Sequence, residues 1–277
     1  MRRRNVTLML TFASVVLCAS GQTTGEVHRD LLLGTKARVA DLSSAFRPPG
    51  NKAAELEPSA QARSHAISQI QSEVDAYFAQ VDPQHFELKS FEQDLRAILA
   101  PFDVEAEYGD PPSSFALDRN GERFLLIAYV LGTGVHGIRT AGWLGGSAIT
   151  IRAYRAVNGG FGLVDSAGSD MDGCRLFVRE LHSPVPNETW LLAWGGVTGS
   201  NGPGIYLVRA YAFDGTKFRT VWAPANASGV TATVTADGFA IQHVDREHSI
   251  PPGWDFVRDD YTLSPDGPRL VLSSPVY

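Results

Sequence analysis

The spacing of hydrophobic positions changes near Ser113, and the change divides the chain into a helical part and a β-rich part. Between residues 59 and 102, apolar side chains recur every three or four positions, which is the period of an amphipathic helix. One apolar stripe begins at Ile67 and another at Leu88, and the helix breaker Pro83 lies between them. The pattern predicts a helical hairpin over residues 59–102, in which each helix buries one face.

From residue 113 to 277, short runs alternate apolar and polar residues and are separated by glycine-containing turns. Alternation is the pattern of a strand with one buried face, and Asn-Gly or Asp-Gly supplies the positive φ angles of tight hairpin turns. The predicted strands lie near residues 115–118, 123–131, 148–156, 161–165, 175–180, 190–197, 205–213, 218–223, 230–236, 239–244, 255–263 and 269–273.

A short sequence pattern recurs within this β-rich part. Residues 151–154 (Ile-Arg-Ala-Tyr) match residues 208–211 (Val-Arg-Ala-Tyr), and residues 257–261 (Val-Arg-Asp-Asp-Tyr) match them more weakly. A glycine turn and an apolar restart follow each copy. The repeat predicts three similar units, each a four-stranded antiparallel meander of roughly 50 residues. The predicted fold class is therefore mainly β, with three such meanders preceded by an α-helical hairpin.

The Arg-x-Tyr strand, the glycine turn and the aromatic restart resemble the blades of secreted β-propeller repeat proteins over residues 113–277. The resemblance is generic and points to no particular family. Three units are fewer than the roughly four to eight blades that usually close a ring. Three arrangements stay open: a partial propeller, a continuous twisted sheet, and a ring closed by oligomerisation.

The first 21 residues have the organisation of a secretory signal peptide. Arginines at positions 2–4 precede an apolar run from Val6 to Leu17, and small residues follow at positions 19–21. The run is shorter than the roughly 20 apolar residues that cross a bilayer. We therefore expect cleavage near Gly21 and a secreted or periplasmic protein with no stable membrane span.

Two other readings of this segment fit less well. A lipoprotein signal would place its cysteine after a small residue, but Cys18 follows Leu17. Paired arginines are common in ordinary signals and are weak support for twin-arginine export. The residues that follow, 22–58, contain Pro48-Pro49-Gly50 and predict a flexible leader.

Charge and cysteine content narrow the class of protein. The chain has 24 basic and 30 acidic side chains, and removal of the three signal-peptide arginines lowers its formal charge from −6 to −9. A nucleic-acid partner is disfavoured because no basic patch is visible. One cysteine, Cys174, would be left in the mature chain, so no internal disulfide is expected. We interpret it as a buried structural thiol at the start of a strand.

Two sequence clusters contain potential metal ligands, and both have simpler interpretations. Residues 243–248 (His-Val-Asp-Arg-Glu-His) are interpreted as a solvated strand end, because the side chains of a strand alternate between its faces. Residues 165–173 are acidic and glycine-rich like a calcium loop, but too few carboxylates alternate correctly, so a connecting loop is favoured. No metal site and no cofactor are predicted. The glycines of residues 132–137 lack the following helix of a phosphate-binding motif.

Exposed aromatic residues are the remaining candidates for binding. Trp143 and Trp254 lie in loops flanked by glycine or proline, where they would offer stacking surfaces for a small-molecule, glycan or peptide ligand. The leading hypothesis is a secreted non-enzymatic binding or scaffold module of unknown ligand and unknown oligomeric state.

The alternative is a secreted hydrolase or metal-dependent enzyme whose residues converge from separate loops. No Gly-x-Ser-x-Gly motif is present. Because a catalytic triad is defined by spatial arrangement and not by sequence order, the absence of this motif does not exclude an enzyme. The residues expected to converge in an enzyme are His136, His182, Asp170 and Asp172.

Overall fold

The computed structural model describes residues 24–43, 60–102, 112–119, 121–132, 147–171, 175–197, 205–225, 227–228, 230–244 and 255–276. Within these ranges the chain begins with helices and continues with strands. The helical elements are α1 (Thr24–Ser43), α2 (Ala60–Phe78), α3 (Leu88–Leu99) and a short 3-10 turn at Ala100–Phe102.

The strands form three antiparallel sheets, each with four consecutive strands in meander order. Sheet 1 contains β1 (Ser113–Arg119), β2 (Glu122–Gly132), β3 (Ser147–Val157) and β4 (Gly160–Ala167). Sheet 2 contains β5 (Arg175–Leu181), β6 (Thr189–Val197), β7 (Ile205–Phe213) and β8 (Phe218–Trp222), and the two-residue β9 (Ala227–Ser228) also pairs with β7. Sheet 3 contains β10 (Thr231–Val234), β11 (Gly238–Val244), β12 (Phe256–Ser264) and β13 (Gly267–Val276). The predicted fold class is confirmed.

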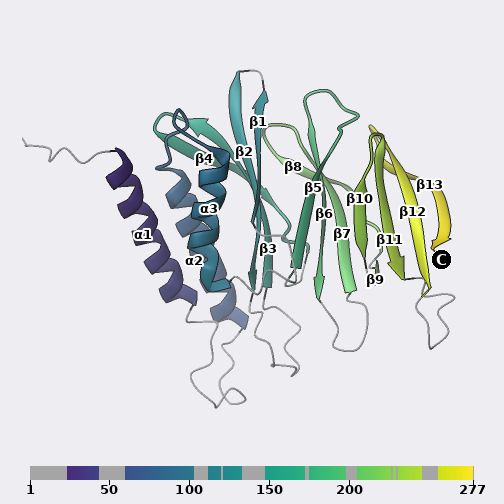
Figure 1. Ribbon diagram of the computed structural model, residues 1–277, viewed down its shortest axis with the longest axis horizontal. Coiled ribbons are helices and arrows are strands. Elements are labelled where there is room, and N and C mark those ends of the chain that lie inside the picture. Colours follow the sequence, from purple (N-terminus) through teal and green to yellow (C-terminus); the bar gives the residue numbers. More distant parts are fainter. Residues whose placement is uncertain are drawn as a thin grey trace, which may run out of the picture.

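The helices and the three sheets form a row of four layers (Figure 1). One hydrophobic cluster joins the helices to one face of sheet 1. A second cluster joins the opposite face of sheet 1 to sheet 2, and a third joins sheet 2 to sheet 3. Among the described buried residues, no cluster joins sheet 3 back to sheet 1. The row therefore has the helices at one end and β13 at the other, and the sheets are separate instead of continuous.

The internal repeat is confirmed by strand register. In every sheet the pairing shifts by one residue just before the repeat tyrosine of the third strand. These tyrosines are Tyr154, Tyr211 and Tyr261. The shift leaves one extra residue in the fourth strand, a β-bulge, and that residue is a valine each time. The bulge residues are Val164, Val221 and Val271.

The hairpin over residues 59–102 is present as α2 and α3, but helix α1 was not expected. The sequence predicts a flexible leader over residues 22–58, whereas α1 extends over 20 of these residues. Thr35 and Val39 are fully buried in this helix, while Leu33 is exposed. The apolar residues of α1 are therefore poorly aligned with its buried face, so they give little helical periodicity.

Residues 1–21 lie outside the described residues, so the signal peptide stays a prediction. In the part of the chain that the structure describes, no helix combines the length and apolar character needed to cross a membrane.

Candidate functional site

Most of the predicted candidate residues lie outside the described residues. This holds for both candidate binding tryptophans, Trp143 and Trp254, and for several potential ligands or catalytic groups: His136, Asp172, Cys174 and residues 245–248. Their expected roles stay predictions.

Two members of the proposed enzyme set, His182 and Asp170, are described. Asp170 is bound to Arg209 and Tyr211, and among the described residues no hydrogen bond or ion pair joins it to His182. Across the described ranges, no group of three or more His, Cys, Asp or Glu side chains is arranged to hold a metal ion.

The loop interpretation of the acidic segment holds only in part, because residues 165–167 belong to β4 while residues 168–171 follow it outside any strand. Asp165 Oδ2 accepts a hydrogen bond from the backbone amide of Phe218 at 2.6 Å. Asp170 accepts hydrogen bonds from Arg209 Nε at 2.8 Å and from Tyr211 Oη at 2.6 Å. Both carboxylates therefore bind donors of the next sheet.

The pair of donors at Asp170 belongs to the repeated Arg-x-Tyr pattern, and sheet 1 uses the same pattern in the same way. Arg152 and Tyr154 both donate to the carboxylate of Asp75 on α2, with Tyr154 Oη at 2.6 Å from Asp75 Oδ1. Because the two donors are two residues apart on a strand, they point to the same face. We call this arrangement, an Arg-x-Tyr pair that binds a carboxylate from an earlier part of the chain, a carboxylate clamp.

The electrostatics of the clamp of sheet 2 favour an ionised acid and a neutral phenol. Burial alone would raise the pKa of Asp170, but hydrogen bonds from Tyr211 and Arg209 hold it below its ordinary value. Burial and the adjacent Asp170 carboxylate raise the pKa of Tyr211 well above its ordinary value. The Tyr211 phenol therefore stays protonated and donates its hydrogen to the charged carboxylate.

Sheet 3 has a modified clamp. The register places Asp259 where Arg152 and Arg209 lie in the other sheets, so the acid is now in the same strand as the tyrosine. Asp259 Oδ2 lies 3.0 Å from His243 Nε2 and 3.5 Å from Tyr261 Oη. Residues 223–230, which lead from sheet 2 to sheet 3, contain no acidic side chain.

Two features of sheet 3 follow from this modification. Arg258, which the sequence pattern aligned with Arg152, points to the outer face and pairs with Asp260 at 2.9 Å. The contact between sheets 2 and 3 rests instead on rings: Trp222 lies 5.4 Å from Phe239 and 4.9 Å from Tyr261, centroid to centroid. An aromatic contact thus replaces the ion pair that holds the first two sheets.

The helix layer is held by a related arrangement. Asp94 on α3 accepts a hydrogen bond from Tyr77 Oη of α2 at 2.7 Å, and His28 Nε2 of α1 lies 2.9 Å from the same carboxylate oxygen. Arg38 of α1 also donates to Glu73 of α2 at 2.6 Å. One acid therefore connects all three helices.

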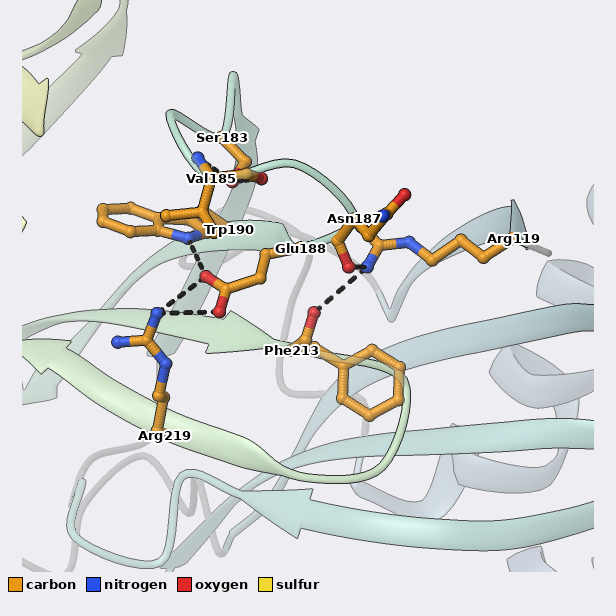
Figure 2. Close-up of polar contacts among 8 residues, drawn as sticks. All are labelled: Arg119, Ser183, Val185, Asn187, Glu188, Trp190, Phe213 and Arg219. Atoms are coloured by element: carbon orange, nitrogen blue, oxygen red, sulfur yellow. Dashed lines mark hydrogen bonds and ion pairs between the residues drawn. The ribbon is translucent and has the colours of Figure 1, made fainter. Parts of the chain in front are cut away.

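A second polar network joins sheets 1 and 2 beside the β5–β6 connection (Figure 2). Arg119, at the end of β1, donates to the backbone oxygens of Asn187 and Phe213 and to Thr189. Asn187 has φ of 61°, the one positive φ among the described non-glycine residues. Asn tolerates this left-handed conformation better than most residues. The turn thus directs its carbonyl toward Arg119.

Glu188 is the acid of this network. It accepts two hydrogen bonds from Arg219 at 2.9 and 2.7 Å and one from the indole of Trp190 at 2.8 Å, as Figure 2 shows. Burial would raise the pKa of Glu188, but the hydrogen bonds from Arg219 and Trp190 lower it. Like the clamps, this network stabilises the packing of strands and keeps its acid charged.

The clamp acid Asp170 predicts a loss of stability at low pH. The pKa of Asp170 is lower in the folded than in the unfolded chain. The stability that its ionised carboxylate contributes is therefore present above the unfolded pKa of about 3.9, and it is lost as the pH falls through the folded pKa. We expect the urea midpoint of the wild type to fall over this pH range. Asp170→Asn should show a smaller fall, and an equal fall in both proteins would contradict the prediction.

A comparison of the chain with family models, curated proteins and solved structures finds no match. The resemblance to β-propeller blades therefore stays a prediction. What the structure itself defines is a mainly β protein of three face-packed meanders on a helical layer, with clamps between its first three layers.

Proposed function

We propose that this protein is a secreted, non-enzymatic binding or scaffold module, whose stacked sheets support a ligand-binding surface at one end. The observation that carries the proposal is that equivalent strand ends of the three sheets lie on one side of the stack. In each sheet the second and third strands are joined through residues 133–146, 198–204 and 245–255 respectively. The paired strand ends that flank them lie along the same side of the row, the lower side in Figure 1.

Two of these connections contain the candidate binding residues Trp143 and Trp254. The clamps at Asp75 and Asp170 fix sheet 1 to the helices and sheet 2 to sheet 1, and so fix the spacing of the strand ends. A frame that is rigid before binding lowers the entropic cost of binding. The ligand class we propose is a glycan, small molecule or peptide that stacks on indole rings.

Export is part of the proposal and rests on the pattern of residues 1–21, a basic segment followed by a short apolar run. The absence of a nucleic-acid partner is proposed from the acidic balance of the chain.

Co-sedimentation with insoluble peptidoglycan, chitin and cellulose tests the binding proposal. We expect the purified protein to sediment with at least one of them, and the double variant Trp143→Ala/Trp254→Ala to bind at least about tenfold more weakly, since each stacking contact contributes about 1 kcal/mol. Trp222→Phe is the matched control, because Trp222 packs on Phe239 between sheets.

Two results would contradict the proposal. One is equal sedimentation of the double variant and the wild type. The other is turnover of an ester or glycoside substrate by the wild type that is lost in His136→Ala or His182→Ala, which would favour the enzyme instead.

A further inference from the structure

Strand β13 has an unusual surface for the edge of a sheet. It is 10 residues long, and among the described strands it pairs with β12 alone. Four of the eight large exposed hydrophobic residues in the described part of the chain belong to it. They are Leu270 (55% exposed), Val271 (63%), Leu272 (55%) and Val276 (38%). Half of the exposed apolar side chains are thus gathered on one strand.

The fourth strands of the other two sheets provide an internal comparison. β8 has only five residues and contains the charged Arg219. β4 contains the charged Asp165 and has one large exposed hydrophobic residue, Leu163. Short length and charge are the usual protections of a sheet edge against pairing with another chain. β13 is longer than either strand, and its one charged residue, Arg269, lies near its beginning, so no charged residue occurs from Leu270 to Val276.

The bulge valines make the same contrast. Val164 packs into the cluster between sheets 1 and 2, and Val221 packs into the cluster between sheets 2 and 3. Val271, at the equivalent position of sheet 3, is exposed. The bulge position is therefore apolar in all three units, but only the third unit leaves it exposed.

A further layer stacked on the outer face of sheet 3 would not suit that face. Three positions of this face that are apolar in sheets 1 and 2 are polar in sheet 3. In sheet 1 they are Ala128, Ile151 and Ala153, and in sheet 3 they are Gln242, Arg258 and Asp260. Burying the Arg258–Asp260 pair would carry a desolvation penalty. A polar outer face is typical of the terminal unit of a stack. The available position is the edge, not the face.

We propose that β13 pairs antiparallel with β13 of a second copy of this chain, forming a dimer in which two copies of sheet 3 are continuous across a two-fold axis. Pro268 and Pro275 lack amide hydrogens and limit the pairing to residues 269–274. Arg269, the one charged residue of that segment, is already paired with Asp266 at 2.9 Å.

Self-pairing suits this segment for reasons of charge and symmetry. An isologous contact brings together the same surface of both copies. Antiparallel pairing near Leu272 places Arg269 of one copy opposite the other end of the segment in its partner, so like charges do not meet. The exposed leucine and valine side chains then pack on each other across the new strand pair.

Sedimentation velocity of the purified protein tests the dimer, with lysine placed at matched positions of two edges. Leu270 and Leu163 occupy the same position relative to the repeat tyrosine, since Leu270 pairs with Tyr261 and Leu163 with Tyr154. We expect the wild type and Leu163→Lys to be dimers. Leu270→Lys should dissociate, with its dimer dissociation constant raised at least about tenfold.

Circular dichroism and thermal unfolding check that both lysine variants fold, and Leu272→Lys provides a second variant on the other face of β13. A monomeric wild type would overturn the proposal, even if β13 then bound a foreign peptide. A dimer that persists unchanged in both Leu270→Lys and Leu272→Lys would overturn it as well. None of these outcomes depends on Trp143 or Trp254, so the dimer and the binding proposal fail separately.

Discussion

Replacing Asp75 with alanine is expected to lower the free energy of unfolding by about 3 kcal/mol or more, the typical cost of leaving a buried charge without its partner. Asp75 accepts from both Arg152 and Tyr154. The Arg152 side chain is nearly buried, and its Nε has no hydrogen-bond partner among the described residues. Without Asp75 the guanidinium would be left in an apolar interface between α2 and sheet 1.

Urea unfolding followed by circular dichroism measures this effect. Asp118→Ala is the matched control, because Asp118 is also paired with an arginine, Arg123, but its side chain is 74% exposed. Exposed pairs contribute little, so the control should change stability by less than about 1 kcal/mol. Arg152→Met in the Asp75→Ala background should recover part of the loss. Equal effects of Asp75→Ala and Asp118→Ala would show that the buried pair is not important for stability.

Replacing Gly160 with alanine is expected to lower the free energy of unfolding by about 3 kcal/mol, at the upper end of the usual cost of overpacking. A Cβ atom on Gly160 would lie 1.9 Å from the backbone oxygen of Ala79 and 2.4 Å from its carbonyl carbon. These are backbone atoms just beyond the end of α2, so no side-chain rotation relieves the clash. Either α2 or β4 would have to move away from the helix–sheet interface.

Gly162, two residues further along β4, is the control for this substitution. A Cβ there would have Val157 Cγ1 as its nearest neighbour at 3.7 Å, an ordinary contact. Gly162→Ala should therefore be neutral or slightly stabilising, because alanine loses less conformational freedom on folding than glycine does. Unfolding in urea compares the two variants, and a Gly160→Ala protein as stable as Gly162→Ala would contradict the close approach of α2 and β4.

The strands could be predicted well because their pattern is local. The strand expected near residues 205–213 is β7 (Ile205–Phe213), and the strand expected near 148–156 is β3 (Ser147–Val157). Alternation and positive-φ glycines specify both the faces and the turns, as at Gly215 with φ of 96°. Helix α1 was missed because its burial comes from Thr35 and Val39 packing on other helices, which is a tertiary effect.

The clamps could be predicted only in part. The Arg-x-Tyr pattern was recognised as a repeat, but its acids lie 77 residues before Arg152 and 39 residues before Arg209. No fixed spacing connects each acid with its Arg-x-Tyr pair, because Asp75 lies in α2 and Asp170 in the segment between β4 and β5. Asp170 lies in the segment that resembles a calcium loop. The more useful signal is that this segment before the second repeat is acidic, while residues 223–230 before the third contain no acid.

In sheets 1 and 2, the repeated Arg-x-Tyr pattern binds a carboxylate from an earlier part of the chain. A double-mutant cycle between Asp170 and Tyr211, using Asp170→Ala, Tyr211→Phe and the double variant in urea unfolding, tests it most directly. The clamp predicts a coupling energy of about 1 kcal/mol or more, because either substitution alone removes the same hydrogen bond. Additive effects, equal to within about 0.3 kcal/mol, would contradict it.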